Sequence, residues 1–187
     1  MYHLRRLVFA LLLTVCAYAS AQQKHGDGVE DVLQYLPYAS VFGLKVCGVE
    51  SRDEWPKLAV TTAASWVVTA GVTYTLKHTV KEWRPDNTDQ KSFPSGHTAF
   101  VFAGATMLHK EYGHLSPWIS VGGYGLATFT AVDRVIKDRH HWYDVAAGAG
   151  IGFLSAELTC YLSSKVFKSE QMSLTFSGNS VDFALCW

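Results

Sequence analysis

The chain alternates long apolar stretches with short polar segments. Four of the apolar stretches follow residue 57: Leu58 to Leu76, Ser95 to Leu108, Pro117 to Val132 and Tyr143 to Leu162. The first supplies nineteen residues without a charge, which is nearly a spanning length. The other three are rich in Gly, Ala, Ser and Thr, the small residues that let helices approach closely inside a bilayer. The pattern predicts an all-α protein built as a compact helical bundle.

The first fifty residues add an export signal and one further helix. A basic start precedes the apolar run Leu7 to Val15, and Ala19-Ser20-Ala21 fits the small-x-small rule for cleavage. Residues 1–21 are therefore predicted to be a signal peptide or an uncleaved signal anchor. The stretch Val32 to Val49, kinked at Pro37, would span a thin membrane or lie in its interface. The bundle has six helices if the first is kept, and five after cleavage.

The tail of the chain follows a different pattern. In SLTFSGNSVDFALCW, the pair Gly178-Asn179 separates two alternating, β-prone pieces, which predicts a small hairpin. Four regions result: the export segment 1–21, an N-terminal segment 22–57 with one membrane or interfacial helix, a core 58–165, and a tail 166–187.

Composition changes this picture in one respect. Of the 187 residues, 49% are hydrophobic and only 17% are charged, so the bundle is apolar enough for an integral membrane protein. The formal net charge is zero, which gives no reason to expect a nucleic-acid partner. A soluble all-helical protein with buried helices remains the alternative, because two of the stretches are shorter than the ~20 residues of a straight crossing.

Three polar clusters interrupt the bundle where one apolar helix ends or the next begins. They are Lys77 with Arg84, then Ser95, Gly96 and His97 within Pro94 to His97, and finally Arg134, His140 and Asp144. Short connections favour antiparallel neighbours, so the chain leaves one face at the first cluster and returns to it at the others. All three clusters are expected to converge.

The converging groups suit a phosphate. Lys77 and Arg84 are seven residues apart, two helical turns, so both project from one side. Ser95 is a natural N-cap, and a helix start offers unpaired N–H groups to an anion, with Gly96 allowing close approach. Arg134 adds a guanidinium able to grip two phosphate oxygens. These cations can take the place of a metal, and no metal or cofactor is expected.

The histidines supply the reactive groups. His140 and Asp144 are four residues apart, so the carboxylate can accept a hydrogen bond from one imidazole nitrogen and leave the other to attack phosphorus. His97 is then placed to give a proton to the leaving oxygen. A metal site made by His140, His141 and Asp144 is a weaker alternative, because imidazole and carboxylate spacing alone does not exclude it.

These residues together resemble a known signature. Lys77 with Arg84-Pro85, the sequence PSGH at Pro94 to His97, and Arg134, His140 and Asp144 with gaps of five and three are similar to the three motifs of the type 2 phosphatidic acid phosphatase superfamily. That superfamily includes lipid phosphatases, bacterial acid phosphatases and vanadium haloperoxidases. The resemblance covers most of the chain after Leu58.

The resemblance implies a role for each matched residue. Lys77, Arg84, Ser95, Gly96 and Arg134 would bind the substrate phosphate. His97 would be the general acid, His140 would form a phosphohistidine, and Asp144 would orient it. The superfamily usually has serine where this chain has Asp133, a carboxylate that would repel phosphate unless it is turned away or paired with Arg134 or Lys137. We expect Asp133 to change affinity without abolishing activity.

The function predicted on these grounds is a metal-independent phosphatase that acts on a phosphorylated membrane lipid. The lipid would be lipid A, undecaprenyl diphosphate or a phospholipid phosphate, with the active site on the periplasmic face of the inner membrane. Two alternatives remain open: a soluble periplasmic acid phosphatase of broad specificity, and a noncatalytic protein that binds or transports phospholipid.

Overall fold

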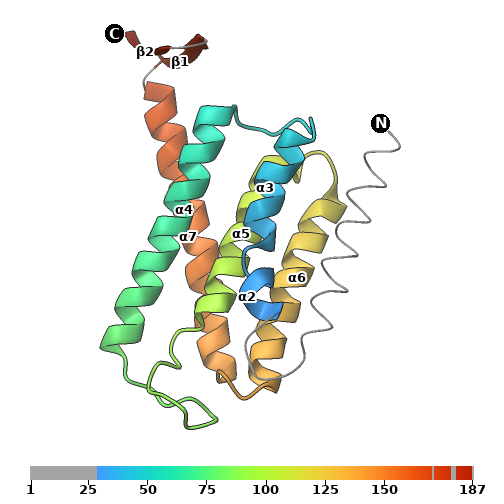
Figure 1. Ribbon diagram of the computed structural model, residues 1–187, viewed down its shortest axis with the longest axis vertical. Coiled ribbons are helices and arrows are strands. Elements are labelled where there is room, and N and C mark those ends of the chain that lie inside the picture. Colours follow the sequence, from blue (N-terminus) through green and yellow to red (C-terminus); the bar gives the residue numbers. More distant parts are fainter. Residues whose placement is uncertain (1–28, 170, 178–179, 187) are drawn as a thin grey trace.

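The structure is a computed structural model, and it describes residues 29–169, 171–177 and 180–186. The predicted export segment and the Gly178-Asn179 turn lie outside these residues. Within them the chain forms six helices: α2 (Val29–Leu33), α3 (Leu36–Val46), α4 (Trp55–Thr79), α5 (Gly96–Tyr112), α6 (Pro117–Ile136) and α7 (Trp142–Ser169). Figure 1 shows the long helices running side by side, so the predicted all-α bundle is confirmed.

The first predicted helix is divided in two. Where one helix was expected over Val32 to Val49, the structure has α2 and α3, with Pro37 in the first turn of α3. A proline has no N–H to donate to the carbonyl four residues earlier, which here belongs to Leu33. The helix therefore stops at Leu33 and restarts with proline in its favoured position.

The four later helices lie where the sequence predicts them, but most extend further. α4 continues three residues past Leu76, and α6 continues four residues past Val132. The added residues of α4 are polar and those of α6 begin with the charged pair Asp133-Arg134, so an apolar pattern does not reveal them. As a consequence Lys77 and Arg134 belong to the last turns of α4 and α6, respectively.

Helix α5 is the centre of the bundle and packs against α3, α4, α6 and α7. Its contact with α7 is very close at two glycines. A Cβ at Gly148 would lie 2.5 Å from the Ser95 carbonyl oxygen, and one at Gly152 would lie 2.1 Å from that of Ala99. Glycine is thus required at both positions, and the pair fixes the start of α7 against the start of α5.

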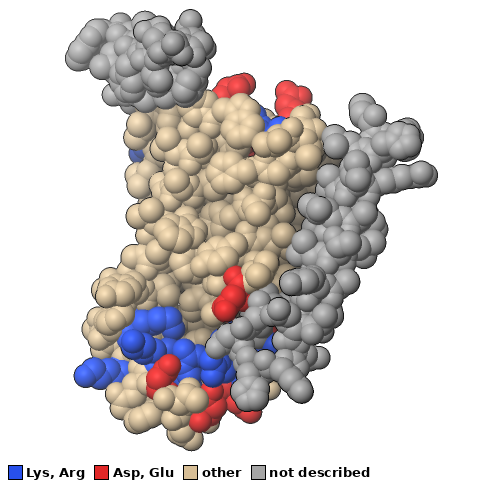
Figure 2. All heavy atoms as spheres, viewed as in Figure 1, with Lys and Arg blue, Asp and Glu red and all other residues tan. Residues whose placement is uncertain are grey.

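In α4 the distribution of side chains is inverted relative to a typical helix of a soluble protein. α4 buries a stripe of hydroxyls, which are Thr61, Thr62, Ser65, Thr69 and Thr73, and it exposes Trp66, Val67 and Tyr74. α6 and α7 likewise expose large apolar residues, among them Phe129, Ile136, Leu154 and Leu158. Between its two ends, the face in Figure 2 is almost free of charge. Within α7, the stretch Trp142–Phe167 is long and apolar enough to cross a membrane.

Two strands follow α7 in the described part of the chain. Strand β1 (Gln171–Ser177) pairs with β2 (Ser180–Cys186) in an antiparallel register that joins Gln171 to Cys186. The two strands form a separate ribbon at the end of the bundle remote from the loops that follow α4 and α6.

Candidate active site

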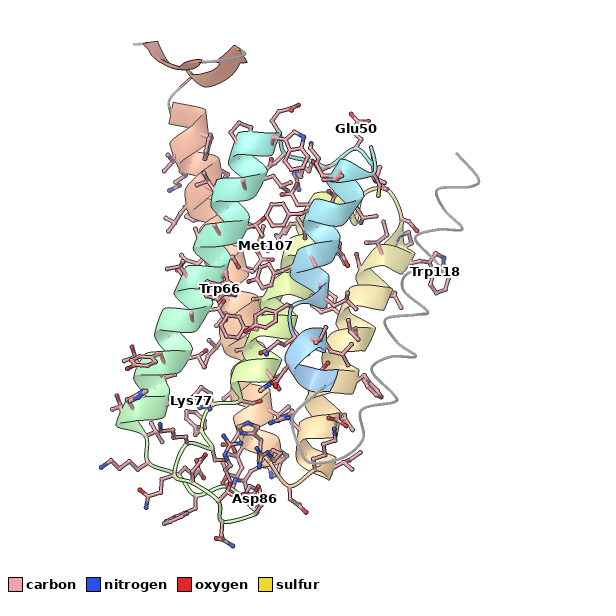
Figure 3. All side chains as sticks on the ribbon, viewed as in Figure 1. Glu50, Trp66, Lys77, Asp86, Met107 and Trp118 are labelled. Atoms are coloured by element: carbon pink, nitrogen blue, oxygen red, sulfur yellow. The ribbon has the colours of Figure 1, made fainter. Side chains whose placement is uncertain are left out.

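The predicted polar clusters meet at one end of the bundle. Lys77 and Asp86 mark this end in Figure 3, whereas Glu50 marks the opposite end. Lysine and arginine side chains gather there in Figure 2. The loop after α4 is tied to the turn between α6 and α7: the Asp86 N–H donates to the Asp138 carbonyl at 3.2 Å, and the Asp86 carboxylate pairs with Arg139 at 3.1 Å. Two clusters remote in the sequence are thereby joined.

Lys77 and Arg84 reach the site by different routes. The helical argument for their common direction is wrong, because α4 ends at Thr79 and Arg84 lies in the loop. That loop folds back through a bridge between Glu82 and Lys91, so Lys77 Nζ donates to the Lys91 carbonyl at 2.9 Å. Arg84 Nε donates to Asp89 Oδ1 at 2.9 Å. The loop, not a helix face, holds the two cations together.

The start of α5 lies between these cations and α7. Ser95 occupies the N-cap position as predicted, but its hydroxyl bonds the Thr98 hydroxyl at 2.9 Å and caps no backbone N–H. Its own N–H donates to the Asp144 carbonyl at 3.0 Å. At Gly96, a Cβ would come within 3.6 Å of Lys77 Cε. The Lys77 side chain therefore lies beside the first turn of α5.

Arg134, His140 and Asp144 are ionisable residues of the site that are almost completely buried. They are exposed by only 1%, 2% and 0%, respectively. The Arg134 carbonyl accepts the backbone N–H of His140 at 3.3 Å, so the end of α6 positions the histidine directly. The last turn of α6 therefore places a buried positive charge next to the turn that carries His140.

The His140 and Asp144 pair has ion-pair geometry. His140 Nδ1 lies 3.8 Å from Asp144 Oδ2, beyond hydrogen-bond distance. The same oxygen accepts the Ser92 hydroxyl, and it also accepts the His141 N–H at 2.9 Å. The predicted hydrogen bond is therefore absent between these two described side chains. Asp144 nevertheless lies nearer to Nδ1 than a full helical turn, as an ion-pair partner of the imidazole.

The pKa of His140 is strongly lowered, to about 2. Burial is the largest cause, because it disfavours the charged imidazolium, and the positive charges of Lys77, Arg84 and Arg134 act in the same direction. Hydrogen bonding to the Ser92 backbone acts in the opposite direction. His140 is thus neutral at physiological pH, and a neutral imidazole has the lone pair that a nucleophile needs.

His97 lies in the first turn of α5, next to Gly96. Its Nε2 is 2.6 Å from Asp31 Oδ1, a carboxylate of α2. The side chain of His97 is 21% exposed and that of Asp31 is 51% exposed, so the pair lies at the rim of the site.

The negative charge of Asp133 is paired with a lysine of the same helix end. Its carboxylate pairs with Lys137 Nζ at 3.1 Å, one helical turn later. The structure therefore takes one of the two arrangements that the sequence allowed for this residue.

A possible metal cluster differs from the one considered in the sequence analysis. Ligand atoms of Glu82, His141 and Asp144 lie within 4.8 Å of one another, and His140 is not among them. Several of these atoms already make hydrogen bonds: Glu82 accepts from the Tyr143 hydroxyl, and Asp144 Oδ2 accepts from Ser92 and His141. A metal ion would have to replace these bonds.

All eight predicted residues thus belong to the same end of the bundle, and their individual roles stay predictions. Sequence reasoning missed three supporting residues: Asp31 beside His97, Asp89 beside Arg84, and Ser92 beside Asp144. Ser92 lies two residues before the PSGH motif and carried no signal of its own. Asp31 lies far away in the sequence, and nothing in the polar stretch that contains it predicts this contact.

Comparison with known proteins establishes the family. Residues 57–168 match the PAP2 superfamily, so the chain belongs to that superfamily. The lipid A 1-phosphatase of Porphyromonas gingivalis is 38% identical over 141 residues, which are 75% of this chain and 32% of that protein. Lipid phosphate phosphatase 1 of Saccharomyces cerevisiae is 40% identical over 67 residues, 34% of this chain and 24% of that protein.

Among solved structures, Aquifex aeolicus LpxE superimposes with a TM-score of 0.53 at 21% identity, covering 71% of this chain and 83% of that one. This likeness supports the fold. The chain spans only about a third of the length of the lipid A 1-phosphatase.

Proposed function

We propose that this chain is a membrane-bound phosphoric ester hydrolase that removes phosphate from a lipid. The observation that carries the proposal is a buried, neutral His140 imidazole surrounded by the positive charges of Lys77, Arg84 and Arg134. Three fixed cations attract a phosphate and compensate the charge that develops during transfer. Burial and, to a smaller extent, the same cations keep the nucleophile unprotonated.

In the first half-reaction, His140 Nε2 attacks phosphorus and the bond from phosphorus to the lipid oxygen breaks. His97 gives its proton to the departing oxygen. The phosphorylated imidazole gains positive charge, which Asp144 stabilises from 3.8 Å. A phosphohistidine results.

In the second half-reaction, a water molecule attacks phosphorus and the bond between nitrogen and phosphorus breaks. His97, now neutral, accepts the proton of that water and returns to its initial state. Lys77, Arg84 and Arg134 hold the three peripheral oxygens in both steps, so the positive charge needed for catalysis comes from side chains.

The proposed substrate is a membrane lipid, because the surface around the bundle is apolar. Exposed residues such as Trp66, Phe129 and Leu154 would be unfavourable in water and favourable in acyl chains. Lipid A is the first lipid to test, since the P. gingivalis relative is named a lipid A 1-phosphatase. Undecaprenyl diphosphate and phospholipid phosphates such as phosphatidic acid are the other lipids to test as substrates.

We further propose an inner-membrane location with the site facing the periplasm. The basic residues Lys57, Lys110 and Lys165 then lie at the cytoplasmic end, as the positive-inside tendency favours. The export signal predicted in residues 1–21 agrees with this orientation.

Phosphate release by the purified full chain in detergent tests the activity. The rate of phosphate release should fall by about 10³-fold or more in His140→Ala, and by about 10²–10⁴-fold in His97→Ala. His141→Ala is the matched control, because it removes an adjacent imidazole without removing either reactive ring, and it should stay within about tenfold of the parent. Equal activity in all three variants would reject the assignment. Binding of a phospholipid without release by the parent protein would favour the transport alternative.

The absence of a metal requirement is tested separately. Activity should persist in EDTA and be inhibited by vanadate, which adopts the geometry of the transferred phosphoryl group. Loss of activity in EDTA with recovery on adding a single divalent cation would instead favour the Glu82, His141 and Asp144 cluster.

A further inference from the structure

We propose that Asp31 is a positioning residue for His97: the carboxylate of α2 holds the imidazole at the rim of the site and stabilises its protonated form. This inference rests on the proposed function, because it concerns the proton that His97 gives to the leaving oxygen. The observation behind it is the 2.6 Å contact between Asp31 Oδ1 and His97 Nε2. No family motif contains Asp31, which precedes the matched residues 57–168.

The contact is built into the fold. α2 packs against both α5 and α6, and the Gln34 side chain donates to the Asp31 carbonyl at 3.1 Å, which fixes the end of α2. The chain then restarts as α3, whose Pro37 and Tyr38 lie so close to Gly104 of α5 that a Cβ there would meet them at 2.9–3.1 Å. α2 is thus held against the helix that carries His97.

The charges around His97 explain why such a carboxylate is needed. Lys77 of α4 lies beside Gly96, the neighbour of His97, and Arg134, His140 and Asp144 belong to the same end of the bundle. The charged residue of α3, Lys45, bonds to Ser51 and Asp53 at the far end of the bundle. Lys77 and Arg134 bring positive charge, which opposes protonation of a second imidazole. Asp31 opposes that effect.

Within this proposal, the contact at Nε2 gives the two ring nitrogens different roles. With Nε2–H donated to Asp31, the proton for the leaving oxygen comes from Nδ1, so the acid is a doubly protonated imidazolium. After transfer, the neutral ring keeps its Nε2–H on Asp31 and presents the Nδ1 lone pair to the attacking water. Asp31 therefore fixes the same ring orientation in both half-reactions.

The direct test measures the charge of His97 without using activity. Diethyl pyrocarbonate modifies neutral imidazole, and mass spectrometry of the full chain reports the rate at His97 as a function of pH. In Asp31→Asn the pH midpoint of this rate should fall by about half to one pH unit. Asp31→Glu should restore part of the shift. Glu50→Gln, which removes one exposed carboxylate at the opposite end of the bundle, should not change it. Identical midpoints in the parent and Asp31→Asn would overturn the inference.

Kinetics separate this inference from the proposed function. In Asp31→Asn the upper limb of the pH profile of kcat/KM should move to lower pH by the same amount, with an unchanged thermal midpoint. A shifted modification profile with an unshifted kinetic profile would mean that Asp31 sets the charge of His97 but that His97 is not the acid. That result would overturn the role of His97 in the proposed function and keep the Asp31 contact.

Discussion

At the residue scale, burial sets the chemical state of His140. Its lowered pKa has a consequence for stability that can be measured apart from catalysis. Below pH 6.5 an unfolded chain binds a proton at this histidine, whereas the folded chain binds it only near pH 2. The free energy of unfolding contributed by this group therefore falls as pH decreases from 6.5 towards 2.

The predicted loss from His140 at pH 5, relative to pH 7, is about 2 kcal/mol. His140→Asn should lack this contribution, so its thermal midpoint in detergent should decrease less between pH 7 and pH 5 than that of the parent. Parallel decreases in the two proteins would show that His140 is not held neutral in the folded state.

Asp133 provides a second prediction at this scale. Because Lys137 already pairs with the carboxylate, replacing it by the serine usual in the superfamily should change little. Asp133→Ser should alter KM by less than about threefold and leave kcat within the same range, as for other partly exposed ion pairs. A tenfold change in kcat, measured by phosphate release, would mean that Asp133 acts on the reacting groups themselves.

At the scale of helices, the contact between α5 and α7 depends on glycine. Gly152→Ala would place a methyl group 2.1 Å from the Ala99 carbonyl oxygen, and the helices would have to separate. We expect the free energy of unfolding to fall by about 1–3 kcal/mol. Each kcal/mol should lower the thermal midpoint by about 2–4 °C.

Gly150→Ala is the matched control for this contact. It lies in the same helix, but its Cβ would meet nothing within 4 Å. Because alanine is the better helix former, this variant should be equal to the parent or more stable by about 0.5–1 kcal/mol. Equal stability of the two variants would argue against the close crossing.

The helices also show what sequence patterns reveal and what they do not. Apolar runs predicted α4, α5, α6 and α7 because burial in lipid or protein requires continuous apolar sequence. They did not predict where α4 stops, because its last turn is polar, and so they placed Arg84 on a helix that ends before it. The division of α2 from α3 was visible only as a proline.

Site residues were predictable to the extent that they lie in short motifs. The motif at the start of α5 predicted Ser95 and His97. The motif that runs from the end of α6 into the following turn predicted Arg134 and His140. Asp31 could not be found in this way, because its contact with His97 joins residues 66 positions apart. Such a contact is determined by how α2 packs, which no local pattern records.

At the scale of the whole molecule, the charges lie at the two ends and the apolar surface lies between them. This distribution predicts that the chain resists carbonate extraction and needs detergent for release. It also predicts that the two ends of the bundle face opposite sides of the membrane. In a background without its own cysteines, Asn87→Cys should react with a membrane-impermeant maleimide from the periplasm, whereas Glu50→Cys should react only after permeabilisation. The reverse labelling pattern would place the site in the cytoplasm.

The central claim is that His140 carries the phosphoryl group between the lipid and water. Rapid quenching of the full chain during turnover of a ³²P-labelled lipid phosphate, followed by peptide mapping under alkaline conditions, tests it most directly. We predict an acid-labile label on His140, absent in His140→Ala and longer-lived in His97→Ala once formed. Turnover with the label on another residue, or with no covalent label under conditions that stabilise phosphohistidine, would contradict it.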